Sequence, residues 1–150
     1  MAEHLDSYIR NWRRIHKQTT RIMALAPDDQ YDWRPAETSM TLGELLNHLW
    51  LSEVGFVAGV LGGERAERPA PLKATAELVA AFDQTHAAAV ERIVTLTPEQ
   101  LEETVTPFGP EHPMKRRVIL TMLHEHEVHH RGQLYVYLRM LGCELPALYS

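Results

Sequence analysis

One long amphipathic segment near the C-terminus, residues 114–141, constrains the fold more than any other part of the chain. Its apolar residues, among them Ile119 and Leu123, recur at the spacing that places them on one face of an α-helix. His126 and His130 fall inside this apolar face, one helical turn apart. Two imidazoles in a dry interior are hard to satisfy with hydrogen bonds, whereas together they can bind a metal ion. The segment therefore predicts a buried helix that supplies two metal ligands, with hydrogen-bonded core histidines as the alternative.

Helical periodicity also marks three earlier segments: residues 3–26, 41–61 and 75–96. Thr41 and Glu44 have the spacing of a capping box, which predicts where the second of these helices begins. The connections are long, and the one β-like fragment, residues 103–106, is too short to build a sheet. The sequence thus predicts an all-α fold, an up-down four-helix bundle with long connections, in which residues 1–150 form one domain.

The composition argues against several classes of protein. A formal net charge of −5 disfavours a nucleic-acid-binding protein, whose surface would be basic. No apolar run approaches the roughly 18 residues of a transmembrane helix, and the first residues lack the pattern of a signal peptide. The single cysteine, Cys143, excludes an internal disulfide and fits a reducing compartment. We therefore expect a cytoplasmic protein that acts on a small molecule, without a nucleic-acid or membrane partner.

Four polar residues stand on or near apolar helix faces. Glu53 falls in the middle of the apolar stripe of residues 41–61, where a lone carboxylate is costly. His48 lies about a third of a turn off that stripe, so periodicity does not decide whether it is a ligand. His86 is on the apolar face of the third helix and is a rival ligand, although a hydrogen-bonded core residue is the simpler interpretation. His16 is near the edge of its stripe and is expected to be an ordinary, partly buried residue.

The run from His126 to His130 also matches the HExxH pattern of zinc peptidases. The extended form of that pattern needs a glycine and a histidine where this chain has Gln133 and Val136. A glutamate ligand normally follows on a separate helix, yet only six residues remain after Glu144. Such enzymes also hold their peptide along a sheet edge, and no sheet is predicted here. A peptidase is therefore the weaker interpretation.

The same segment resembles the DinB-like (YfiT-like) superfamily. The resemblance covers nearly the whole chain, and its most specific part is His129-His130-Arg131-Gly132-Gln133. Further matching segments are Trp33-Arg34-Pro35, the start of the second helix from Thr41 to His48, and Leu138-Arg139 with Gly142. Known members are four-helix bundles, often dimeric, that hold one divalent metal ion with three histidines. The resemblance implies that the ligands here are His48, His126 and His130, and that the protein forms a homodimer.

Three neutral histidines leave a metal ion with open coordination positions, as in a reactive site. The superfamily includes transferases and isomerases that use low-molecular-weight thiols, so we expect a metal-dependent enzyme resembling thiol-dependent S-transferases. The ion, zinc or nickel with iron or manganese as alternatives, would activate water or a cofactor thiolate. A non-catalytic, metal-binding stress-response protein is the alternative, and a metal-free polar core is a third.

Other residues near the motif have open roles. Glu53 is the candidate catalytic residue, as a proton acceptor or as a partner that orients a ligand imidazole, with a buried ion pair as the equal alternative. Gly132 could allow another helix to approach closely. The roles of His86, His129 and Arg131 are not decided by the sequence.

Overall fold

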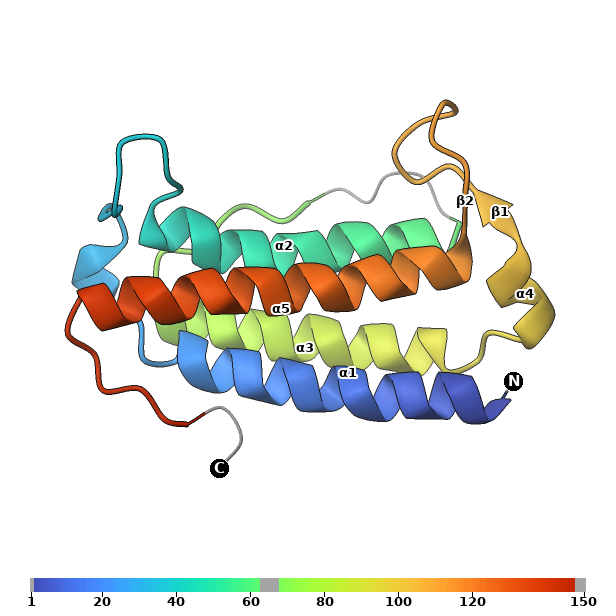
Figure 1. The fold of residues 1–150 in the computed structure, drawn as a ribbon, viewed down its shortest axis with the longest axis horizontal. Coiled ribbons are helices and arrows are strands. Elements are labelled where there is room, and N and C mark those ends of the chain that lie inside the picture. Colours follow the sequence, from blue (N-terminus) through green and yellow to red (C-terminus); the bar gives the residue numbers. More distant parts are fainter. Residues whose placement is uncertain (1, 63–67, 148–150) are drawn as a thin grey trace.

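The fold is a bundle of four long helices, seen in a computed structural model that describes residues 2–62 and 68–147 (Figure 1). The bundle helices are α1 (Ala2–Met23), α2 (Leu42–Val60), α3 (Thr75–Ile93) and α5 (Arg116–Met140). The prediction of an all-α four-helix bundle is confirmed. Within the described residues, no helix combines the length and the apolar character needed to cross a membrane.

The four helices are not arranged so that each one packs antiparallel beside the helix that precedes it in the chain. Both α1 and α2 pack against α3 and α5, so α1 and α2 face each other across the core. The colours in Figure 1 show that α1 and α2 run in opposite directions, as do α3 and α5. In contrast, α2 and α3 run in the same direction, because the segment from Arg68 to Ala74 leads back along the bundle before α3 begins. The long connections in the sequence make this return possible.

Local signals place the helix starts as expected. At α2, the Thr41 hydroxyl accepts a hydrogen bond from the Glu44 backbone N–H at 3.1 Å, and the Glu44 carboxylate accepts one from the Thr41 N–H at 2.7 Å. Thr97 and Gln100 make the same reciprocal pair at the start of the short helix α4 (Pro98–Glu102). These side chains satisfy backbone donors that have no partner in the first helical turn.

A small sheet corrects the expectation that the chain has none. Strand β1 (Thr104–Val105) pairs antiparallel with β2 (Met114–Lys115). The sequence marked residues 103–106, which contain β1, as β-like but did not reveal β2, because a strand of two residues is too short to produce an alternating pattern. Arg116 fixes this hairpin to the bundle, because it donates hydrogen bonds to the Val60 carbonyl at 2.7 Å and the Glu103 carboxylate at 2.8 Å. The hairpin loop is thereby held beside the end of α2.

The connection before α2 is also tied to the core. It contains a short 3-10 helix, η1 (Asp28–Gln30). It also contains Trp33, whose ring packs edge-on against the ring of Tyr137 on α5, with 5.6 Å between the ring centroids. In the connection that follows α2, the backbone of Leu72 makes two 2.8 Å hydrogen bonds with the side chain of Asn47, which is on α2. These contacts anchor the connection before α2 to α5, and the connection after α2 to α2 itself.

The apolar core is divided into two clusters along the bundle. One lies around the end of α1 and the start of α2 and includes Ile22, Leu45, Phe82 and Leu134. The other lies around the start of α1 and the end of α2 and includes Ile9, Val57, Ile93 and Leu123. Between them, at mid-length of all four helices, is a layer of buried polar residues: His16, Thr19, Ser52, Glu53, His86, Glu127 and His130. This polar layer contains all of one group of potential metal ligands described below, and one residue, His130, of the other.

Candidate metal centre

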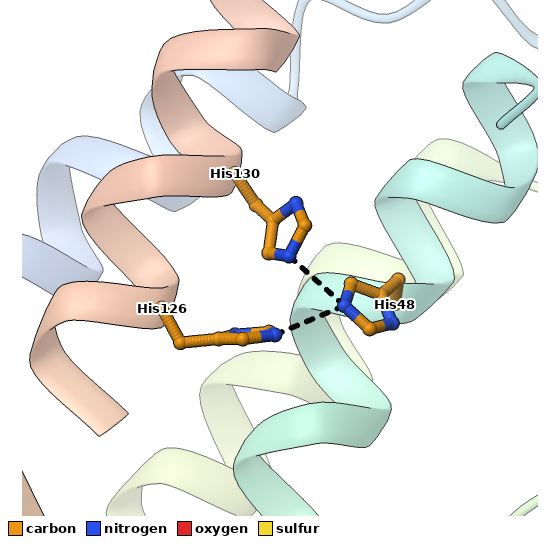
Figure 2. Close-up of side chains that lie close together, drawn as sticks. All are labelled: His48, His126 and His130. Atoms are coloured by element: carbon orange, nitrogen blue, oxygen red, sulfur yellow. Dashed lines mark hydrogen bonds between the residues drawn. The ribbon is translucent and has the colours of Figure 1, made fainter. Parts of the chain in front are cut away.

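Three histidines from two helices converge at the interface between α2 and α5 (Figure 2). The Nε2 atom of His48 lies 3.0 Å from Nε2 of His126 and 3.0 Å from Nε2 of His130. All three side chains point toward one another from their helices, as Figure 2 shows. The structure therefore brings together the three residues that the resemblance selected as ligands.

The position of His48 explains why helical periodicity did not select it. His126 and His130 are one turn apart on α5, so they share a face by sequence spacing alone. His48 is off the main apolar stripe of α2, on the edge of that helix that meets α5. Its imidazole is only half-buried, unlike the fully buried Leu45 and Leu49. Its part in the group depends on how the two helices pack.

The imidazoles are held in the form that binds a metal ion. Burial is the main cause that lowers the pKa of all three, with further lowering from the neighbouring histidines, and the pKa of His126 falls to about 4. They are therefore neutral at pH 7 and each retains a lone pair. His130 donates its Nδ1–H to the Gln133 side-chain oxygen at 2.7 Å, which leaves the Nε2 lone pair free to bind.

The spacing of the nitrogens also fits a metal ion. Zinc–nitrogen bonds of about 2.0–2.1 Å in a tetrahedron place two nitrogens about 3.3 Å apart. The separations of 3.0 Å here are close to that value. One ligand atom from each of the three residues lies within 4.8 Å of the other two. The donor set and its geometry are consistent with a three-histidine site that leaves further coordination positions open.

A pocket of about 800 Å³ adjoins this group and is bordered by His48 and His126. Its other walls come from α2, from Arg68 and from the hairpin loop; they include Ser52, Gly55, Phe56, Gly59, Thr106, Pro107, Phe108 and Gly109. The absence of a side chain at Gly59 is needed here, because a Cβ would lie 2.7 Å from Cβ of Pro107. Among the described residues that line the pocket, Arg68 is the one with a permanent charge, and it helps to lower the pKa of His48. The pocket can accept a small molecule whose anionic group faces Arg68.

The other motif residues lie elsewhere. Glu53 is not part of the three-histidine group; its carboxylate is buried and accepts a hydrogen bond from His86 Nδ1 at 3.2 Å. His129 is exposed, although its ring contacts that of His130 at 4.8 Å between centroids. Arg131 is buried and donates to the Gln18 side-chain oxygen at 3.0 Å. The expectation for Gly132 was wrong, because a Cβ at this position would meet nothing within 4 Å.

A second group of potential ligands was missed by sequence reasoning. His16, Glu53 and His86 are all buried, and their potential ligand atoms lie within 4.8 Å of one another. His16 was expected to be partly buried, but only 5% of it is exposed. One feature of the sequence could have indicated this group: α1, α2 and α3 each carry one such polar residue at a core position. The sequence of a single helix does not show that the three residues lie at the same level along the bundle axis.

Comparison with known proteins gives a consistent result. The family described as the DinB family matches residues 1–150. The YjoA protein of Bacillus subtilis is 31% identical over 137 residues, which covers 87% of this chain and 88% of YjoA. In the structural comparison, YjoA has a TM-score of 0.77 at 27% identity and covers 95% of this chain and 96% of its own.

Two further solved structures share the fold at lower identity. A DinB-like protein from Bacillus cereus has a TM-score of 0.82 at 21% identity, covering 95% of each chain. YfiT from Bacillus subtilis has a TM-score of 0.72 at 17% identity, covering 95% of this chain and 90% of its own. YfiT is described as a probable metal-dependent hydrolase with an unusual four-helix bundle topology. With a family match over its full length and a relative above 30% identity, this chain belongs to the DinB family.

Proposed function

We propose that this protein is a metal-dependent enzyme that holds one divalent ion with His48, His126 and His130 and acts on a small molecule in the adjoining pocket. The observation that carries the proposal is the convergence of three neutral imidazoles at the wall of a pocket of about 800 Å³. A closed structural site would have four protein ligands, whereas a catalytic site keeps a position for substrate. The description of YfiT as a probable metal-dependent hydrolase supports the same class of activity by analogy.

Zinc or nickel is the ion we propose, with iron or manganese as alternatives, because imidazole suits several of these divalent ions. When bound, the ion would supply Lewis acidity to water or to a thiol group. The chain's own residues have distinct tasks. The histidines bind as neutral ligands, Gln133 orients the ring of His130, and Arg68 attracts an anionic group of the substrate.

Thiol-dependent S-transfer is the reaction we propose first. The chain has one cysteine, Cys143, whose Sγ lies 3.8 Å from the Leu25 carbonyl and which is absent from the residues that line the pocket. The nucleophilic thiol must therefore come from a low-molecular-weight cofactor. Hydrolysis of the kind suggested for YfiT is the second reaction, and it would use water in place of the thiol. Homodimer formation and a cytoplasmic location remain predictions from the sequence.

The first experiment is elemental analysis of untagged protein, because a histidine tag binds the same metals. Wild type is compared with His130→Ala, and His129→Ala serves as the matched control on the same helix. We expect His130→Ala to lose one ion per chain relative to wild type, while His129→Ala keeps it. Equal metal content in all three proteins would refute the three-histidine site.

The reaction is tested on protein loaded with zinc or nickel. Common bacterial thiols are offered with an electrophilic acceptor, and loss of free thiol is followed with and without a chelator. We expect turnover that the chelator and His130→Ala both abolish and that His129→Ala retains. If the metal binds as expected but neither thiol conjugation nor ester or amide hydrolysis depends on it, the non-catalytic metal-binding protein is the correct interpretation.

A further inference from the structure

The buried group of His16, Glu53 and His86 has the features of a site in its own right. The three residues come from α1, α2 and α3, so they connect three helices of the bundle. Their exposed fractions are 5%, 1% and 6%, and their potential ligand atoms lie within 4.8 Å of one another. None of the three lines the pocket beside the three-histidine group.

Each of these residues has one polar atom engaged and one without a partner. His16 donates its Nε2–H to Asp83 Oδ1 at 2.8 Å, and His86 donates its Nδ1–H to Glu53 Oε2 at 3.2 Å. The opposite atoms, His16 Nδ1, His86 Nε2 and Glu53 Oε1, are buried and find no hydrogen-bond partner among the described residues. His16, held by Asp83, therefore presents the lone pair of its Nδ1, as histidines that bind metals do. His86 would first have to release Glu53, because its free Nε2 lies on the ring edge opposite the nitrogen that contacts that carboxylate.

Burial disfavours the charged form of each member of the group. Burial raises the pKa of Glu53 well above its ordinary value, and the side chain of Trp12 lowers it only in part. Burial also lowers the pKa of His16 and of His86 to about 4, so neither imidazole offers a positive charge at pH 7. A divalent ion would compensate a buried carboxylate that lacks a cationic partner here.

We propose that His16, Glu53 and His86 form a second metal site, separate from the three-histidine site and independent of the proposed enzymatic function. Two imidazoles and one carboxylate suit a divalent first-row transition metal such as zinc or iron. The rings of His16 and His86 are stacked, 3.8 Å between centroids and 3° apart in orientation, so their lone pairs lie in two parallel planes and cannot both point at one ion in this arrangement. Binding therefore requires one ring to turn. The ion would join α1, α2 and α3 and stabilise the middle of the bundle.

The test uses the full chain with the first site removed by the double substitution His126→Ala and His130→Ala. The protein is unfolded, refolded with zinc and passed over a chelating resin, because a buried site loads and exchanges slowly. We expect one zinc ion per chain that survives the resin and raises the melting temperature. Adding Glu53→Gln should remove that ion, while adding His112→Ala, which alters an exposed histidine, should not.

Two results would overturn this proposal. One is a folded double variant, shown by far-UV circular dichroism, that retains no zinc, in which case the buried atoms are satisfied by water. The other is a zinc ion that persists after Glu53→Gln, which would place it elsewhere. If Glu53→Gln does not fold, X-ray absorption of the cobalt-loaded double variant decides: two imidazoles and a carboxylate are expected, and a shell of water oxygens alone would contradict the site. None of these results depends on whether the three-histidine site is catalytic.

Discussion

Gln133→Leu should weaken metal binding at the three-histidine site, although Gln133 is not itself a ligand. Its side-chain oxygen accepts the Nδ1–H of His130 at 2.7 Å, a short hydrogen bond between residues one turn apart on α5. This bond keeps the proton on Nδ1, so that Nε2 carries the lone pair directed at His48 and His126. It also raises the basicity of His130 and so opposes the effect of burial.

The expected magnitude follows from the role of such partners. Removing a hydrogen-bond acceptor behind a ligand histidine typically costs about 10–100-fold in metal affinity. That factor corresponds to about 1.4–2.8 kcal/mol of binding free energy. Gln133→Glu should preserve or increase the affinity, because a carboxylate is a stronger acceptor for the same N–H.

The assay is zinc binding measured by competition with a chromophoric chelator at pH 7.5. Gln18→Leu provides the matched control, because Gln18 makes a similar hydrogen bond to Arg131, which is not a ligand. The reasoning is refuted if Gln133→Leu binds zinc within about threefold of wild type, or if Gln133→Leu and Gln133→Glu are equally weakened. Circular dichroism confirms that each variant retains its helices.

Three further predictions concern stability in chelator-treated protein. Burial lowers the pKa of His86 from 6.5 to about 4. The stability that neutral His86 contributes to the folded protein is therefore present above pH 6.5 and is lost as the pH falls toward 4. The destabilisation caused by His86→Gln should shrink over that range by up to about 3 kcal/mol. Urea unfolding from pH 7 to pH 4 checks this, and a difference between the two proteins that does not change with pH would contradict it. Gly132→Ala should stabilise the protein by about 0.5–1 kcal/mol, because alanine favours helix and its Cβ meets open space. Gly59→Ala should be destabilising despite the same helical gain, since its Cβ would lie 2.7 Å from Cβ of Pro107; equal effects at the two glycines would show that this contact is not as described.

The fold was largely predictable because its signals are local. Apolar periodicity marks all four bundle helices, and capping residues such as Thr41 and Glu44 mark a helix start through bonds within one turn. The parallel direction of α2 and α3 and the pairing of β1 with β2 were not predictable in this way. Chain direction depends on how a long connection crosses the bundle, and two residues carry no period.

The candidate site was likewise predictable only in part. By itself, the sequence determined that His126 and His130 share one face of a buried helix, because positions four apart are neighbours on any α-helix. The periodicity of α2 left His48 undecided; the family resemblance selected it, and the packing of α2 against α5 brings it to the other two histidines. Likewise, only the assembled bundle brought His16 and His86 to Glu53, because side chains on separate helices meet according to the depth and rotation of each helix, which no single helix encodes.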